Sequence, residues 1–212
     1  MKKGSLIVLS GFSGAGKGTI VKRLLEKHDT YALSISMTTR DPRPGEEEGK
    51  SYFFRSDEEF EKTIAEDGFL EYARYCDHYY GTPLAYVEEC LQKGQDVILE
   101  IEIQGALKVK AKLPETVLIF VTAPSADVLK ERLTGRGTET EDVIKKRLAR
   151  AVEESKGVEN YDYIVVNDDL EACVDTVHAI VEASHCRSSR YLELIVEIGQ
   201  TLSDNSSILR GI

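Results

Sequence analysis

The chain has few cysteines, no long apolar run and too few basic residues to balance its acids. Its four cysteines, Cys76, Cys90, Cys173 and Cys186, contain no CxxC pair, so the sequence indicates neither a zinc site nor a disulfide framework and suits a reducing cytoplasm. No apolar run is long enough to span a bilayer, so we expect no membrane partner. The net charge is −10, with 37 acidic and 27 basic residues, which argues against nucleic acid as a partner.

Short apolar runs alternate with longer amphipathic segments along the 212 residues. The apolar runs predict strands at Ser5–Ser10, Ala32–Ser36, Val97–Ile103, Val117–Ala123 and Tyr163–Val166. The amphipathic segments predict helices at Lys17–Lys27, Pro83–Lys93, Ser125–Leu133, Thr140–Ser155 and Leu170–Ala183. Strands separated by helices predict one α/β domain, a three-layer fold with a central parallel sheet covered on both faces.

Residues from about 38 to 80 break this alternation. They begin with the turn-rich, charged stretch "RDPRPGEEEGK", and a capping-box pattern, Ser56-x-x-Glu59, then predicts the start of a helix. We interpret this region as an inserted small α+β subdomain. After about Arg190 the pattern predicts a further helix followed by the polar tail "SDNSS".

The stretch "LSGFSGAGKGTIVKRLL" places four glycines between the first predicted strand and the first predicted helix. Gly11 to Gly16, followed by Lys17, fits the GxxxxGK spacing of a phosphate-binding loop. Glycines let backbone N–H groups turn toward an anion, the helix N-terminus attracts negative charge, and a lysine at this position reaches the outer phosphates. The alternative is a flexible glycine-rich turn. Gly18 stands where the motif expects a Ser or Thr for Mg²⁺, and Thr19 is next to it.

Several motifs occur in a fixed order, and together they are highly specific: "SGAGKGT", "SMTTRDPRPGE", "YFF", "FLEYA", "YYGT", "IQGA", "GRGTET" and "NYDYIVVND". In these motifs the chain resembles the guanylate kinases, which transfer a phosphoryl group from ATP to GMP. The resemblance implies a P-loop fold with core segments 1–37, 81–134 and 157–190, a GMP-binding insert at about 38–80, a lid at about 135–156 and a C-terminal tail at about 191–212. It also implies ATP and GMP as substrates and Mg²⁺ as cofactor.

The predicted ATP site combines the phosphate loop with residues matched by resemblance. It comprises Gly11, Ser13, Gly14, Ala15, Gly16, Lys17, Gly18, Thr19, Arg132, Arg136 and Asn167. Lys17, Arg136 and Arg147 are the predicted catalytic residues, because arginines on a closing lid neutralise charge on the transferred phosphoryl group and exclude water. Mg²⁺ is expected near Thr19 and Glu100. Asn167, at a strand end, is equally typical of a turn.

Two arginines three positions apart, Arg40 and Arg43, suit the bidentate capture of a phosphate monoester. By resemblance they bind the GMP phosphate together with Tyr52 and Tyr80. Alternatively, the arginines balance the neighbouring "GEEEG", and the ring of Tyr52 packs as a strand residue.

Glu71 is a carboxylate between apolar residues, where burial is unfavourable unless donors surround it. Guanine offers such donors at N1–H and N2–H₂, whereas adenine presents a lone pair at N1. By resemblance Glu71 reads the base, assisted by Thr82, Ser36 and Glu102. Glu100 and Glu102 stand where aspartates are expected, and the alternative for both is an exposed strand face.

Two other functions remain open from the residues alone. One is a kinase that phosphorylates another phosphorylated acceptor, against which Glu71 and Thr82 argue. The other is a guanylate-kinase-like module that binds phosphorylated peptides, against which the intact Gly16-Lys17 loop argues. The sequence leaves the oligomeric state open.

Overall fold

The computed structural model describes residues 3–134, 149 and 151–204. Its centre is a five-stranded parallel sheet with the strand order β2-β7-β1-β8-β9. The strands are β1 (Leu6–Gly11), β2 (Tyr31–Leu33), β7 (Asp96–Leu99), β8 (Val117–Thr122) and β9 (Tyr163–Val166). The inner strands β1 and β8 are almost entirely apolar and buried, as expected for strands covered on both faces.

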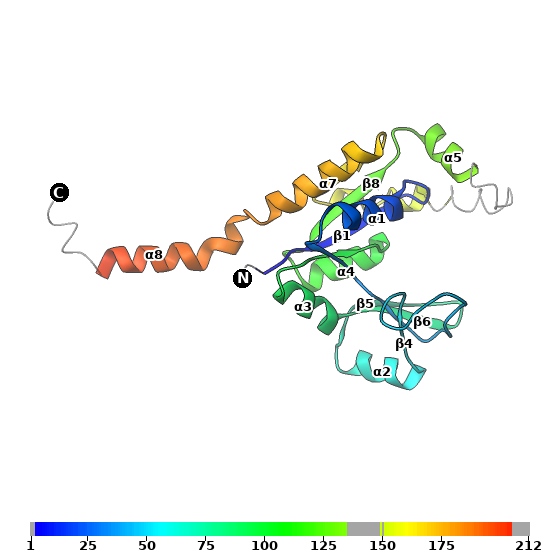
Figure 1. Cartoon of the computed structure of the whole chain (residues 1–212), viewed down its shortest axis with the longest axis horizontal. Helices are drawn as coiled ribbons and strands as arrows, with labels where there is room; N and C mark the ends of the chain where they lie inside the picture. The colour runs from blue at the N-terminus through cyan, green and yellow to red at the C-terminus, as the bar shows by residue number, and fades with distance from the viewer. Residues whose placement is uncertain (1–2, 135–148, 150, 205–212) are drawn as a thin grey trace.

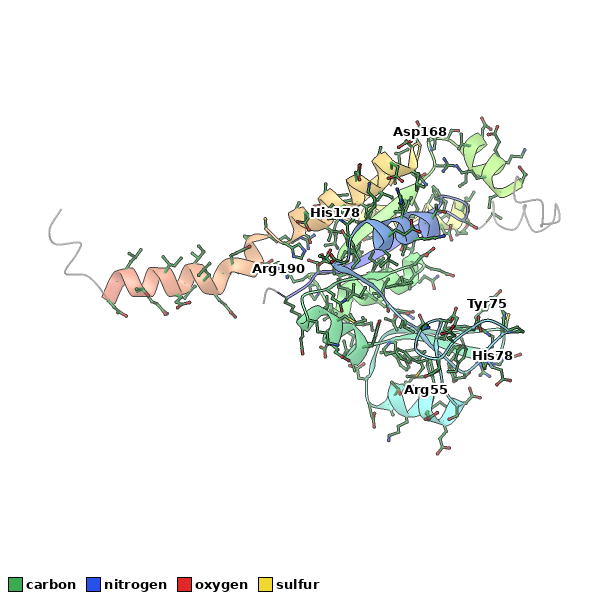
Figure 2. All side chains as sticks on the ribbon, viewed as in Figure 1. Arg55, Tyr75, His78, Asp168, His178 and Arg190 are labelled. Carbon is green, nitrogen blue, oxygen red and sulfur yellow. The ribbon has the colours of Figure 1, made fainter. Side chains whose placement is uncertain are left out.

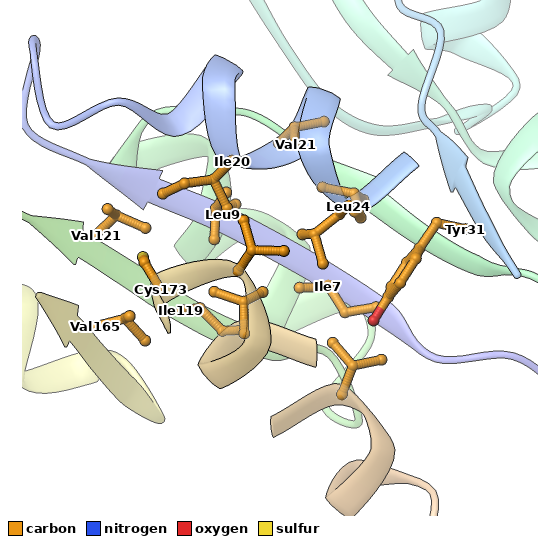
Figure 3. Close-up of a cluster of buried hydrophobic side chains, with 14 of the residues drawn as sticks. Ile7, Leu9, Ile20, Val21, Leu24, Tyr31, Ile119, Val121, Val165 and Cys173 are labelled. Atoms are coloured by element: carbon orange, nitrogen blue, oxygen red, sulfur yellow. The ribbon is translucent and has the colours of Figure 1, made fainter. Parts of the chain in front are cut away.

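Helices cover both faces of this sheet, so the predicted three-layer α/β fold with a central parallel sheet is confirmed. One face packs against α1 (Lys17–Lys27) and α7 (Leu170–Ser184), which bury residues such as Leu24 and Cys173 (Figure 3). The other face packs against α3 (Leu84–Gln92) and α4 (Ile103–Lys112). A further helix, α5 (Ala126–Thr134), follows β8.

The prediction of a strand from Val97 to Ile103 is wrong beyond Leu99. The chain leaves the sheet at Glu100, and Glu102 becomes the N-cap of α4 with extended backbone angles. The helix was missed because its sequence "IQGALKVKAK" contains a glycine and presents only Ala106 and Val109 as fully buried residues. The strand predicted at Ala32–Ser36 is also shorter than expected, because β2 ends at Leu33.

The region after β2 contains a second, mixed sheet of four strands in the order β4-β3-β6-β5. The strands are β3 (Met37–Thr38), β4 (Phe53–Phe54), β5 (Phe69–Tyr75) and β6 (His78–Pro83). Helix α2 (Asp57–Ala65) begins with the predicted capping box, in which the Ser56 and Glu59 side chains bond each other's backbone N–H. A two-residue turn at Cys76 and Asp77, both with positive φ, joins β5 to β6.

The chain after α7 continues through a short turn and a final helix before the end of the described part. A 3₁₀ turn at Ser188–Tyr191 leads into α8 (Leu192–Asp204), which extends away from the rest of the molecule (Figure 1).

Another 3₁₀ turn, Val158–Asn160, precedes β9. Most of the helix predicted at Thr140–Ser155 lies outside the described residues, although residues 151–154 are helical. No helix in the described ranges is both long and apolar enough to cross a membrane.

Candidate functional site

The predicted phosphate loop connects β1 to α1 at the carboxyl edge of the central sheet. Gly14 and Gly16 adopt positive φ, 89° and 92°, a region that other residues enter with strain. A Cβ on Gly16 would lie 2.6 Å from Asn167 Nδ2, so the loop also has no room for a side chain there. The backbone of this loop therefore requires glycine at Gly16 for two independent reasons.

Two polar side chains hold the loop. Lys17 Nζ donates to the carbonyls of Gly11 at 2.7 Å and Phe12 at 3.2 Å, so its side chain folds back over the loop. Asn167 is buried, and its Nδ2 donates to the carbonyl of Ala15 at 2.8 Å. Asn167 was predicted from its resemblance to an adenine-side position, and the structure adds that it braces the phosphate loop from the end of β9.

A cavity of about 440 Å³ opens beside this loop. Its lining includes Lys17, Tyr75, Glu100, Glu102 and Glu154. Partial burial raises the pKa of the Glu100 carboxyl, while the Lys17 ammonium opposes that rise. The cavity therefore brings one ammonium and several carboxylates together, an arrangement suited to a phosphate chain carrying a divalent cation.

Gly18 lies beside Glu100, one of the residues that line this cavity. A Cβ added to Gly18 would be 3.7 and 3.9 Å from the two carboxylate oxygens of Glu100, which is ordinary van der Waals contact. The missing hydroxyl of the phosphate-loop motif would thus point toward Glu100. Both Glu100 and Thr19 as metal ligands stay predictions.

Glu71 lies in the second sheet, where β5 pairs with β6. Thr82 Oγ1 donates to Glu71 Oε1 at 2.7 Å, so the predicted pair is in contact. Burial raises the pKa of the Glu71 carboxyl; the Thr82 hydrogen bond and Lys108 lower it, and the charge of Glu102 raises it further. A carboxylate in such a place favours a ligand that supplies N–H donors.

The N-terminal turn of α4 borders both Glu71 and the cavity beside the phosphate loop. A Cβ on Gly105 would lie 3.4 Å from Glu71 Oε2, so Gly105 keeps the space beside that oxygen open. Glu102, the N-cap of α4, both lines the cavity and acts electrostatically on Glu71. The two predicted nucleotide sites are therefore neighbours, with Glu102 between them.

The predicted phosphate-binding arginines are joined by Glu46. Arg40 Nη1 and Nη2 donate to the two carboxylate oxygens of Glu46, both at 2.9 Å, and the backbone N–H of Arg43 donates to the same carboxylate at 2.7 Å. This ion pair raises the pKa of Arg40 and lowers that of Glu46. The pairing of Arg40 with the "GEEEG" stretch is thus present, and a phosphate role for Arg40 and Arg43 stays a prediction.

Aromatic rings surround this arginine. The Arg40 guanidinium lies 5.4 Å from the ring centroid of Tyr52, and the rings of Tyr52 and Tyr80 are 6.2 Å apart in an edge arrangement. The neighbouring Tyr80 side chain also helps to raise the pKa of Arg40, after the larger effect of Glu46. Arg40, Tyr52 and Tyr80 therefore form one cluster, and the backbone of Arg43 joins it through Glu46.

Other predicted residues are placed less directly. Arg136 and Arg147 lie outside the described residues. Arg132 lies on α5. This helix contacts the phosphate loop through Leu133, whose side chain would lie 3.0 Å from a Cβ added to Gly14. Ser36 is partly buried, and its carbonyl accepts from the N–H of Phe53.

Sequence reasoning missed two residues of this site. Tyr75 and Glu154 line the cavity, yet neither belongs to a pattern with a chemical signature. Tyr75 is found only once β5 is known to run from Glu71 toward the phosphate loop (Figure 2). The pairing of Arg40 with Glu46 corresponds to the alternative in which the arginines balance the "GEEEG" stretch.

Comparisons with known proteins agree on one family. A family model described as guanylate kinase matches residues 3–184. A guanylate kinase from Caldanaerobacter subterraneus is 54% identical over 93% of this chain and 96% of its own length, and one from Clostridioides difficile is 52% identical with the same coverage. A crystal structure of guanylate kinase from Anaplasma phagocytophilum is 33% identical, with a TM-score of 0.68 over 90% of both chains.

Proposed function

We propose that the cavity beside Lys17 and the pocket at Glu71 are the two nucleotide sites of this chain, because the chain belongs to the guanylate kinase family. The chain is an ATP:GMP phosphotransferase of purine nucleotide metabolism that converts ATP and GMP to ADP and GDP. The assignment of residues within that reaction is our proposal. The observation that carries it is the position of Glu102, which lines the Lys17 cavity and interacts with Glu71.

On the ATP side, the phosphate loop binds the β- and γ-phosphates. Its glycines present backbone N–H groups, and Lys17 leaves the carbonyls of Gly11 and Phe12 to contact the outer phosphate oxygens. Asn167 keeps the loop in shape from β9. Arg132, Arg136 and Arg147 supply further positive charge to the transferred group, by resemblance to the family.

On the GMP side, Glu71 accepts the N1–H and N2–H₂ donors of guanine. Thr82 orients the carboxylate by donating to Oε1, which leaves Oε2 beside Gly105 for the base. Arg40, Arg43, Tyr52 and Tyr80 hold the GMP phosphate, and Ser36 and Glu102 complete the pocket. The GMP phosphate oxygen then attacks the γ-phosphorus in line, and the protein contributes mainly position and charge.

Mg²⁺ is the metal we propose for this site. Glu100 fits it, because its carboxylate lies in the cavity with Lys17 and beside Gly18, and oxygen ligands suit this cation. Thr19 is the second proposed ligand. When bound, the metal neutralises charge on the ATP phosphates. The proposed compartment is the cytoplasm, with ATP and GMP as partners and no nucleic acid.

A nucleoside monophosphate panel tests the proposal. The full chain is incubated with ATP, Mg²⁺ and each of GMP, AMP, CMP and UMP, and ADP release is measured. We expect rapid ADP release with GMP alone, and loss of that release in Lys17→Ala. Release with a ribose bisphosphate in preference to GMP would favour a different acceptor. An absence of release with every acceptor, together with binding of a phosphorylated peptide, would favour a binding module.

A further inference from the structure

A second cluster of metal-ligating side chains lies at the amino edge of the central sheet, away from the nucleotide sites. Asp96 begins β7, Glu182 lies in the last turn of α7, and His185 is the C-cap of that helix. One side-chain atom of each residue lies within 4.8 Å of the other two. Asp96 and His185 are 89 positions apart, so no local spacing in the sequence reveals this cluster.

The imidazole of His185 and the carboxylate of Asp96 are already spaced as two ligands of one ion. His185 Nε2 lies 3.1 Å from Asp96 Oδ2 and also 3.1 Å from Oδ1. Two ligands that each bind about 2.0–2.2 Å from one ion, at adjacent positions, lie roughly 3 Å apart. Glu182 is exposed, so its side chain can turn to bring an oxygen into bonding range of the same ion.

Asp96 is a buried carboxylate without a lysine or arginine to neutralise it. Its side chain is 4% exposed, and within the described ranges its ion-pair partner is His185, which is charged only when protonated. Asp96 Oδ1 also accepts from the backbone N–H of Ser5 at 2.7 Å, which fixes the orientation of the carboxylate. Buried charges are normally paired or bound to a metal. A cation beside Asp96 would therefore stabilise the fold.

Glu182 differs from the other acidic residues of α7. Nearer the start of the helix, Glu171 pairs with Arg23 and Lys27, and Asp175 pairs with Lys27. In the part of the chain that the structure describes, no lysine or arginine forms an ion pair with Glu182. The end of α7 therefore carries an acidic group that its own surroundings leave for another cation.

Two further observations indicate a negative potential at this edge of the sheet. Burial raises the pKa of the Tyr31 hydroxyl, and the charges of Asp96 and Glu182 raise it further. The C-terminal end of α7, where His185 lies, is the negative end of the helix dipole. Both observations favour a cation at the cluster.

We propose that Asp96, Glu182 and His185 bind one divalent transition-metal ion, for which Zn²⁺ is the probe. Imidazole and carboxylate ligands together are typical of Zn²⁺, and three protein ligands leave a position for water. Mg²⁺ prefers oxygen ligands and suits an imidazole poorly. The cluster therefore differs in chemistry from the Mg²⁺ site proposed at Glu100.

The cluster is also separated from the nucleotide sites in space. Helix α7 begins three residues after Asn167, which holds the phosphate loop, and its 15 residues span about 22 Å before His185. The labels of Asp168 and Arg190 mark the two ends of this stretch in Figure 2. A bound ion joins the first residue of β7 to the end of α7, so it stabilises the fold and takes no part in phosphoryl transfer.

Calorimetric titration of the full chain with Zn²⁺, in excess Mg²⁺ and without nucleotide, tests the proposal. We expect one Zn²⁺ per chain and a melting temperature that rises with the Zn²⁺ concentration. His185→Gln and Glu182→Gln should each weaken binding by at least about tenfold, because even the loss of a residue that supports a ligand costs about 10–100-fold. Unchanged GMP-dependent ADP release should show that both variants are folded.

Two control variants separate this cluster from other ligands. Cys186 is exposed and follows His185, so Cys186→Ser shows whether a thiolate binds the ion. His78 begins β6 in the second sheet, so His78→Gln shows whether a histidine elsewhere on the chain is responsible. Both control variants should bind Zn²⁺ like the wild type.

Three results would overturn the proposal. They are a wild type that binds no Zn²⁺ in excess Mg²⁺, unchanged Zn²⁺ binding in His185→Gln, and loss of Zn²⁺ binding in either control variant. The first would mean that Asp96 pairs with His185 alone, and the other two would place the ion at different side chains.

Discussion

Replacing Glu71 with glutamine separates the binding of guanine from the packing of the pocket. The substitution keeps the size of the side chain, and Thr82 Oγ1 still donates to the Oε1 oxygen, as it does at 2.7 Å in the wild type. The amide nitrogen then takes the place of Oε2, beside Gly105. An N–H group of guanine would face another N–H group at this position, where the wild type offers a carboxylate oxygen.

The loss follows from the type of contact. Removing a charge-assisted hydrogen bond and leaving a buried donor unpaired costs about 2–4 kcal/mol, or on the order of 30- to 1,000-fold in kcat/KM for GMP. Adenine presents one donor and one acceptor, which an amide matches, so the AMP activity should fall far less. The ratio of kcat/KM for GMP to kcat/KM for AMP should therefore fall, mainly because kcat/KM for GMP falls.

The same substitution should have the opposite effect on stability. Burial raises the pKa of Glu71 above its ordinary value of 4.5, so the folded protein binds this proton more tightly than the unfolded chain does. The contribution of Glu71 to the free energy of unfolding therefore declines as the pH rises from 4.5 through the raised pKa. At pH 7 Glu71→Gln should be more stable than the wild type, and below about 4.5 the difference should vanish.

Steady-state kinetics with GMP and AMP, and urea unfolding at two pH values, measure both effects. Thr82→Val and Thr82→Ser form the control pair, because the first removes the hydroxyl that orients Glu71 and the second keeps it. The serine variant should retain GMP activity, whereas the valine variant should lose part of it. Equal losses of GMP and AMP activity in Glu71→Gln would refute the reasoning and leave Glu71 a structural residue.

Lys17→Ala should lower kcat by orders of magnitude while the melting temperature stays close to that of the wild type; near-normal turnover would contradict its role at the phosphates. Gly18→Ser has room beside Glu100 and should leave kcat within about tenfold, or roughly 1.4 kcal/mol of barrier, in a titration of Mg²⁺; a large gain at low Mg²⁺ would show that the native site lacks a ligand. Asn167→Ala should raise the KM for ATP and lower the free energy of unfolding by about 1–3 kcal/mol, because the Ala15 carbonyl loses its buried donor. An unchanged KM for ATP would show that this hydrogen bond is not needed for nucleotide binding.

Local patterns predicted the elements whose signals lie within one segment. The run at β1 and the glycines before Lys17 located the strand, loop and helix, and Ser56 with Glu59 located the start of α2. The start of α4 was missed, because Glu102 caps it with backbone geometry and makes no side-chain capping bond. The sequence pattern at such a start resembles a continuing strand.

Contacts between distant segments could not be predicted in this way. The position of Tyr75 at the cavity depends on the course of the hairpin formed by β5 and β6. Asn167 was singled out only through a family resemblance, and its hydrogen bond to Ala15 required the three-dimensional order of the strands. Residues that carry chemistry are therefore easier to predict from one sequence than the residues that hold them in place.

The bond between Asn167 and the Ala15 carbonyl also affects how the protein matures during synthesis. Its two residues are 152 positions apart, and β9, which carries Asn167 to the loop, is among the last strands to leave the ribosome. A nascent chain that ends before this strand contains the complete glycine motif but lacks the Asn167 side chain that donates to the Ala15 carbonyl. The nucleotide site is therefore finished only when most of the domain has been translated, although its most recognisable motif is made first.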